Sequence, residues 1–151
     1  MRLHTLVRSG GRSCHCGSRG CLETEVTQSR LFDLVGVVSG DSVHLEEALR
    51  THDGAAVARE IQRQLSYLEI ALRNAVNVFN PESIVLDGFL GVLEALAPGE
   101  LEAALKATAM DGPGLEVAVH RAALGADLMM IGAAELAFSG FLADPVGAWR
   151  A

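Results

Sequence analysis

The chain has 151 residues, of which half are hydrophobic and three are cysteines, and its formal net charge is −7. This length fits one domain with a buried core, and the negative charge argues against a broad phosphate-binding surface for nucleic acid. No apolar run approaches the roughly 18 residues of a membrane span, and no secretory signal is found, so we expect no membrane partner. An odd number of cysteines does not suit a disulfide framework. We therefore expect a cytoplasmic protein with reduced thiols.

The first predicted elements are an extended segment at 2–8 and a glycine- and serine-rich loop at 9–20. From Glu23 to Val35 apolar side chains cluster on one side, which predicts a helix that Gly36 ends. Segment 41–54 predicts a second short helix, with an Asp or Ser cap at its start and a glycine at its exit.

The clearest element is a long helix that begins near residue 54. Its apolar residues recur at spacings of three and four, which keeps one stripe in register over about six turns. Pro81 ends this helix, because the residue before a proline is pushed out of the α region. The stripe consists of Val57, Ile61, Leu65, Leu68, Leu72, Val76 and Phe79.

The second half of the chain predicts alternating strands and helices. Short apolar runs at 82–88 and 115–124 predict strands, the first of them buried on both faces. Helices are expected around 92–97 and 101–108, and a last apolar helix at 125–142, where small residues at 132–134 would allow tight packing. This order favours an α/β fold with parallel strands.

All three cysteines lie in the early loop, in the pattern His4-x9-Cys14-x-Cys16-x4-Cys21. Cys3His is a common ligand set of structural zinc, so the pattern predicts a tetrahedral zinc site. On an extended segment Cys14 and Cys16 would point to one side and His15 away from it. The glycines at 10, 11, 17 and 20 would allow the sharp turns that bring the ligands together.

Two other interpretations of the cluster stay open on spacing alone. The thiols could be unligated, with His4 an ordinary polar residue, or a ligand set could include His15. A catalytic thiol is disfavoured, because no residue is identified as its base.

The motif H-x9-C-x-C-G-x-x-G-C-L-E resembles the zinc motif of the ROK family of bacterial sugar-responsive repressors and sugar kinases. The segments LRNAVNVFNPESIVLDGFLG and LGADLMMIGAAELAF also resemble that family, in the same order along the chain. The resemblance implies an actin-like ATPase, or ribonuclease H-like, carboxy-terminal lobe with a zinc-binding loop. It implies zinc ligation by His4, Cys14, Cys16 and Cys21.

The resemblance also implies a sugar site beside the metal. Glu23, two residues after the last cysteine, would contact sugar hydroxyls, which suits a carboxylate because it accepts hydrogen bonds without competing donors. His4 would serve both metal and sugar, with one ring nitrogen on zinc and the other donating to the ligand. A plainer interpretation of Glu23 is a carboxylate placed favourably near a helix N-terminus.

Parts of the family pattern are missing. We find neither the Asp-Gly-Gly-Thr phosphate loop nor the catalytic aspartate, so residues 1–151 are expected to be a single carboxy-terminal domain without the amino-terminal lobe or any helix-turn-helix. We therefore expect no catalytic residue and no phosphoryl transfer by this chain. After its first strand the chain has Asp87 and Phe89, at the place where the resemblance implies Gly-Gly-Gly in the kinases of the family. The Asp87 carboxylate would repel the phosphates of a nucleotide, and the Phe89 side chain would crowd its approach to the backbone.

These features favour the sugar-binding part of a ROK transcriptional repressor, which would respond to its effector through a shift in conformational populations. The alternative is the carboxy-terminal lobe of a sugar kinase, inactive in this form. The resemblance implies a sugar or sugar-phosphate effector, a homodimer, and contact with DNA only through a helix-turn-helix that this chain lacks.

Overall fold

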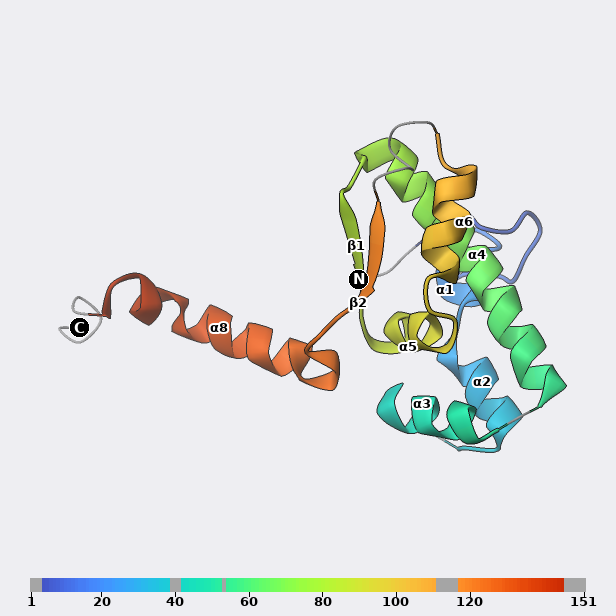
Figure 1. The fold of residues 1–151 in the computed structure, drawn as a ribbon, viewed down its shortest axis with the longest axis horizontal. Coiled ribbons are helices and arrows are strands. Elements are labelled where there is room, and N and C mark those ends of the chain that lie inside the picture. Colours follow the sequence, from blue (N-terminus) through green and yellow to red (C-terminus); the bar gives the residue numbers. More distant parts are fainter. Residues whose placement is uncertain (1–3, 39–41, 53, 111–116, 146–151) are drawn as a thin grey trace.

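The computed structural model of the chain describes residues 4–38, 42–52, 54–110 and 117–145 (Figure 1). Helices pack with a small two-stranded sheet, so the predicted α/β fold is confirmed. The elements in chain order are α1 (Leu22–Glu25), α2 (Gln28–Val35), α3 (Ser42–Thr51), α4 (Ala55–Phe79), β1 (Ser83–Leu86), α5 (Gly88–Leu96), α6 (Glu100–Thr108), β2 (Ala118–Arg121), the 3-10 turn η1 (Gly125–Asp127) and α8 (Leu128–Ala143).

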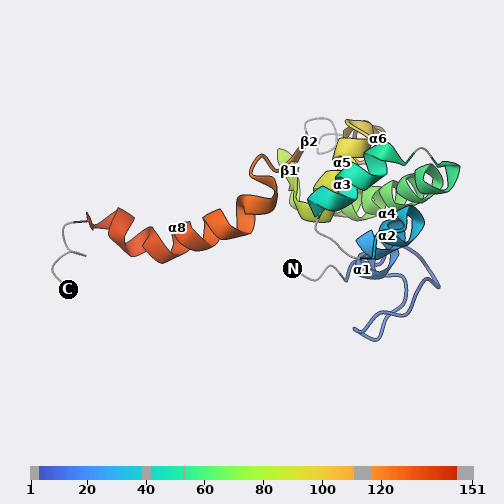
Figure 2. The same cartoon turned by 90° about the horizontal axis from the view of Figure 1, so that it is seen from below.

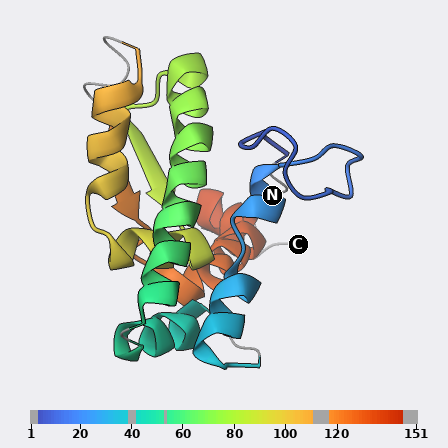
Figure 3. The same cartoon turned by 90° about the vertical axis from the view of Figure 1, so that its right-hand side faces the viewer.

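The sheet consists of β1 and β2, which pair in parallel with Ser83 opposite Ala118 and Leu86 opposite Arg121. The predicted parallel arrangement is therefore confirmed, with α5 and α6 as the crossover. Helices α4 and α6 lie side by side over one face (Figure 3). The prediction that β1 is buried on both faces is wrong, because Leu86 is buried whereas Val85 is 61% exposed, on a face that no described element covers.

The long helix α4 follows most of the predicted stripe. Four of its seven members, Val57, Leu65, Leu68 and Val76, are buried in the core. Phe79 is wrongly predicted, since its side chain is 77% exposed, on the side of the last turn away from the core. Asn80 ends the helix in the left-handed conformation and donates its backbone N–H to the carbonyl of Val76.

The helix predicted from Glu23 to Val35 is broken into α1 and α2. At the break, the buried side chain of Gln64 accepts a hydrogen bond from the Thr27 N–H at 3.0 Å and donates one to the Thr27 carbonyl at 3.1 Å. This amide replaces the hydrogen bonds that a continuous helix would give Thr27, so the chain can turn there without leaving backbone groups unpaired.

Helix α8 projects away from the body of the molecule (Figures 1 and 2). The final helix is confirmed, but none of its residues is buried, and Leu136 is 77% exposed. The tight packing predicted for the small residues is therefore absent from the described chain, and a Cβ at Gly132 would meet nothing within 4 Å. Within the described ranges, we find no helix with both the length and the apolar character needed to cross a bilayer.

Candidate metal centre and its surroundings

The cysteine-bearing loop forms a closed turn against the chain that precedes it. Leu6 and Cys21 form an antiparallel bridge, and the N–H of Leu22 donates to the carbonyl of Thr5 at 2.8 Å. The predicted return of the chain toward His4 is thus confirmed. Within the loop, a turn links Cys14 and Ser18, whose backbone groups hydrogen-bond at 2.8 Å.

Glycine is required at Gly20, where φ is +78°. A Cβ there would collide with the carbonyl oxygen of Arg8, so no other residue fits without moving the backbone. Gly17 also has a positive φ, of +90°, but a Cβ there would meet nothing within 4 Å. A substitution at Gly17 therefore tests the backbone conformation alone, whereas a substitution at Gly20 tests the backbone conformation and the close packing together.

The structure brings the four predicted metal ligands together. The donor atoms of His4, Cys14, Cys16 and Cys21 all lie within 4.8 Å of one another. His4 Nδ1 lies 3.5 Å from Cys14 Sγ, and the sulfurs of Cys16 and Cys21 are 3.6 Å apart. All three cysteines are free of disulfides, so this cluster has the donors and the spacing to hold one metal ion.

The thiols of Cys16 and Cys21 lie in different environments. Burial raises the pKa of Cys21 to about 12, and the neighbouring sulfurs of Cys16 and Cys14 add to this effect. A hydrogen bond from the Ser18 backbone lowers the pKa of Cys16. This environment therefore disfavours the Cys21 thiolate, and a cation next to the sulfur would favour it.

His15 is closer to the cluster than predicted. Its Nδ1 lies 3.9 Å from Cys14 Sγ, and its ring centroid is 4.8 Å from that of His4. The expectation that His15 points away is wrong because residues 15–17 form a turn rather than an extended strand. His4, His15 and Glu23 form a second group that could hold a cation.

Glu23 lies on α1 beside this cluster. Its Oε2 is 3.7 Å from His4 Nδ1, and its Oε1 is 3.9 Å from His15 Nδ1. Oε2 is a buried oxygen with no hydrogen bond among the described residues, although the side chain as a whole is 36% exposed. One oxygen of this carboxylate therefore lies inside the cluster without a hydrogen-bond donor among the described residues.

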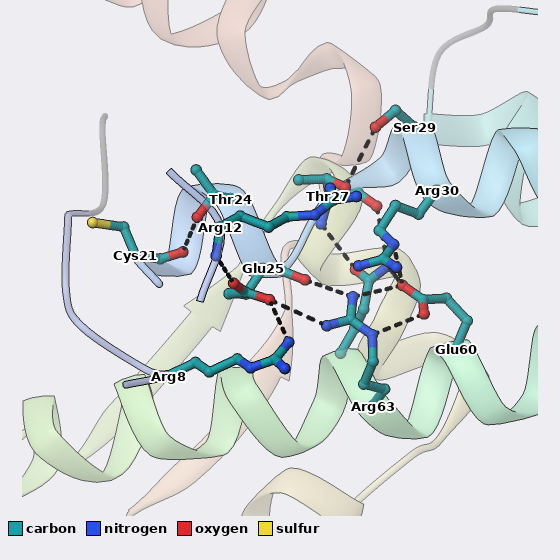
Figure 4. Close-up of polar contacts among 11 residues, drawn as sticks. Arg8, Arg12, Cys21, Thr24, Glu25, Thr27, Ser29, Arg30, Glu60 and Arg63 are labelled. Carbon is teal, nitrogen blue, oxygen red and sulfur yellow. Dashed lines mark hydrogen bonds and ion pairs between the residues drawn. The ribbon is translucent and has the colours of Figure 1, made fainter. Parts of the chain in front are cut away.

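Glu25 anchors the loop to the core and was not predicted (Figure 4). It is fully buried, and its Oε1 accepts a hydrogen bond from the Arg12 backbone at 2.7 Å. Its Oε2 lies 3.6 Å from Arg8 Nη1 and 3.5 Å from Arg63 Nη1. The carboxylate thus ties two points of the loop to helix α4.

A weak sequence signal for this network existed. Glu25 follows Glu23 by two residues, and residues at that spacing on a helix face different directions, so one carboxylate faces the cluster and the other faces inward. Gln64 lies seven residues after Val57, at a stripe position where a polar residue has to find a buried partner.

Comparison with known proteins matches the ROK family profile to residues 4–139. The chain belongs to the ROK family. The Escherichia coli K12 protein named DNA-binding transcriptional dual regulator NagC is 26% identical over 140 residues, which cover 82% of this chain and 34% of that protein. A glucokinase of Thermotoga maritima is 31% identical over 102 residues, which cover 56% of this chain and 32% of the enzyme.

A solved structure shares the fold. It is described as a ROK family transcriptional regulator and homolog of the E. coli MLC protein, with a TM-score of 0.60 and 20% identity, over 79% of this chain and 33% of that one. The ROK chain thus spans about a third of the length of the relatives it matches. Those relatives include both regulators and kinases.

Proposed function

We propose that this chain is the effector-binding part of a ROK transcriptional regulator, in which a structural zinc ion shapes a sugar site. We propose further that it corresponds to the carboxy-terminal lobe of the family's actin-like fold. The observation that carries the proposal is the convergence of His4, Cys14, Cys16 and Cys21 beside Glu23.

The donor set suits zinc. Around a tetrahedral zinc ion, with sulfurs at about 2.3 Å and a nitrogen at about 2.0 Å, two sulfurs would lie about 3.8 Å apart and a sulfur and the nitrogen about 3.5 Å apart. The Cys16–Cys21 distance of 3.6 Å and the His4–Cys14 distance of 3.5 Å are close to these values. Three thiolates and one imidazole leave a net charge of −1 with the dication, which limits the cost of burying the site.

Glu23 and His4 would bind the sugar. The carboxylate of Glu23, whose side chain is 36% exposed, would accept from a hydroxyl group. With His4 Nδ1 toward the sulfurs, the other ring nitrogen would remain protonated and donate to the sugar. The zinc ion would thereby fix both the position and the tautomer of a sugar-binding side chain.

Two observations favour a regulator over a kinase. The match to NagC covers 82% of this chain, whereas the match to the glucokinase covers 56%. Asp87, at the start of α5, has a buried Oδ1 without a hydrogen bond among the described residues, and such a carboxylate would repel a nucleotide phosphate. The higher identity of the glucokinase match, 31%, supports the kinase alternative.

The remaining parts of the proposal concern partners. Two copies would associate, and DNA would be contacted only through a helix-turn-helix outside these 151 residues, because the net charge of −7 disfavours DNA contact by the chain itself. A cytoplasmic location would keep the three cysteines reduced and able to bind the metal.

Metal analysis and calorimetry test the proposal together. The purified chain should contain one zinc per molecule and bind a neutral hexose or N-acetylhexosamine, measured by isothermal titration. Glu23→Gln should weaken sugar binding at least tenfold, since an ionic hydrogen bond is lost, and should keep its zinc. The exposed Glu47→Gln serves as the control.

Zinc retention with equal sugar affinity in Glu23→Gln would remove Glu23 from the site. Absence of zinc from protein prepared without chelators would refute the metal proposal. Saturable binding of a nucleoside triphosphate to the same chain would instead favour the kinase lobe.

A further inference from the structure

A second site candidate lies on the opposite side of the Glu25 network from the cysteine cluster. A hollow of about 450 Å³ opens there between the loop, α2 and the start of α4. This volume lies within the roughly 300–1,000 Å³ range of small-molecule sites. Its lining residues are Arg12, Arg30, Asp33, Leu34, Ala56, Arg59, Glu60 and Arg63.

The lining is cationic in an acidic protein. Four of the chain's twelve lysines and arginines line this hollow, and with two carboxylates they give it a net charge of +2, against −7 for the chain. The guanidinium groups come from three elements: Arg12 from the loop, Arg30 from α2, and Arg59 and Arg63 from α4. They can therefore approach a ligand from several directions.

Two of these arginines are already occupied. Arg63 donates to Glu60 at 2.7 and 2.8 Å, and Arg30 lies 3.3 Å from the same carboxylate (Figure 4). Burial alone would raise the pKa of Glu60, but hydrogen bonds from Arg63 and Gln64 outweigh this and lower it. Glu60 thus stays ionised and is neutralised by its two arginine neighbours.

The other two arginines carry the inference. The side chains of Arg12 and Arg59 are exposed, and within the described ranges neither makes a hydrogen bond or ion pair. Ala56, in the first turn of the 25-residue helix α4, also lines the hollow, and no side chain caps that helix. Its N-terminal N–H groups add partial positive charge on the same side.

We infer that this hollow binds a small phosphorylated molecule, whose phosphate group is held by Arg12 and Arg59 with support from Arg30. Guanidinium forks recognise phosphate through paired hydrogen bonds, and several forks from different directions suit a tetrahedral group better than a planar carboxylate. Leu34 and Ala56 provide apolar surface for the rest of the molecule. The site is separate from Glu23 and does not depend on the proposed sugar function.

Asp33 makes the inference sharper. It is exposed, lines the same hollow and has no ion-pair partner among the described residues, so its negative charge opposes an anion. Its removal should therefore strengthen binding, whereas removal of either free arginine should weaken it. Opposite effects of these substitutions, with no effect of a distant arginine, would locate the bound anion at this hollow, because salt screens charges more than about 10 Å away.

The test is calorimetric titration of the 151-residue chain with inorganic phosphate, glucose 6-phosphate and glucose in separate arms. We expect saturable binding of phosphate and tighter binding of the phosphate ester. Arg12→Gln and Arg59→Gln should each weaken ester binding about tenfold, the effect of one lost charge-assisted contact. Asp33→Asn should tighten it several-fold, and Arg73→Gln, about 21 Å further along α4 than Arg59, should leave it unchanged.

Three outcomes would overturn the inference. They are no saturable binding of phosphate or ester in the millimolar range, equal loss in the Arg73→Gln control, and tighter binding of an oligoglutamate peptide than of the ester. Glu23→Gln distinguishes the two sites, because ester binding here should persist in that variant even if the proposed sugar site fails.

Discussion

The cysteine-bearing loop at residues 4–21 and helix α8 lie near opposite ends of the chain, and their side chains are packed very differently. The loop is polar and rich in glycine, yet Cys21 is fully buried and Glu25, just beyond it, ties the loop to α4. Helix α8 is apolar along its length, yet none of its residues is buried. In these two regions, therefore, hydrophobicity alone does not decide which side chains are buried.

This difference has a physical basis. A loop outside regular helices and strands satisfies its polar groups through turn hydrogen bonds and side chains such as Glu25, and these specific contacts fix one conformation. An apolar helix satisfies its own backbone and can remain intact wherever it lies, but its exposed side chains favour association with another surface. The loop should therefore be sensitive to single substitutions, and α8 insensitive to them.

The largest effect is expected for Gly20→Ala. The added Cβ would collide with the Arg8 carbonyl at a positive φ, so the loop could not close. We expect loss of bound metal and a fall in the free energy of unfolding of about 4 kcal/mol or more, the range of severe backbone or metal-site defects. Metal analysis and urea denaturation would measure both.

Gly17→Ala is the matched control for this prediction. Its Cβ would enter open space, so only the left-handed conformation is penalised, by about 1–2 kcal/mol. If both variants lose equal stability, close packing at Gly20 does not hold the loop.

The next effect concerns Glu25. Glu25→Gln keeps the shape and the acceptor for the Arg12 N–H but removes the charge that faces Arg8 and Arg63. Arg8 is half exposed and Arg63 keeps its other carboxylate partner, so no buried charge is left alone. Thermal and urea unfolding should therefore show a loss of about 1–3 kcal/mol, the cost of disturbing a buried polar group. Glu47→Gln, at an exposed position, should change the free energy of unfolding by less than about 0.5 kcal/mol.

The two regions also differ in how far the sequence predicts them. Spacing and glycine positions indicated the metal cluster, because four ligands have to approach one point and the residues between them have to permit it. Periodicity indicated α4 and α8. It did not reveal that α8 lies away from the core. An apolar pattern predicts that a helix favours burial, but it does not predict which surface will cover that helix.

Other misses have similar causes. The break at Thr27 depends on Gln64, which lies 37 residues away in the chain, and local patterns do not report such long-range hydrogen bonds. The exposure of Val85 on β1 depends on which elements reach that face of the sheet, again a tertiary property. The phosphate-site candidate combines arginines from three segments, each of which is unremarkable in sequence.

A pair of leucine substitutions compares the core with α8 directly. Leu68 is fully buried on α4, so Leu68→Ala should cost about 2–5 kcal/mol. Leu136→Ala should change stability by less than about 0.5 kcal/mol in the monomer. Urea denaturation at several protein concentrations, with sedimentation to determine mass, would measure both.

A large and concentration-dependent cost of Leu136→Ala would show that α8 is buried between copies in solution. A large cost that does not vary with concentration would contradict the projecting position of α8.

The smallest effect is a pH dependence from the ion pair that joins α3 to β2. Glu46 accepts from Arg121 at 2.6 and 3.0 Å, and these hydrogen bonds, with that from Arg50, lower its pKa against the opposing effect of burial. A carboxyl whose pKa is lower in the folded state stabilises the fold above its unfolded pKa, near 4.3, and loses this contribution as the pH falls through its folded pKa. As the pH falls from about 5 to below the folded pKa of Glu46, the free energy of unfolding should therefore decrease by up to about 1 kcal/mol through this pair. In Glu46→Gln that part of the acid dependence should disappear, while an unchanged pH profile would show that the pair contributes no net stability.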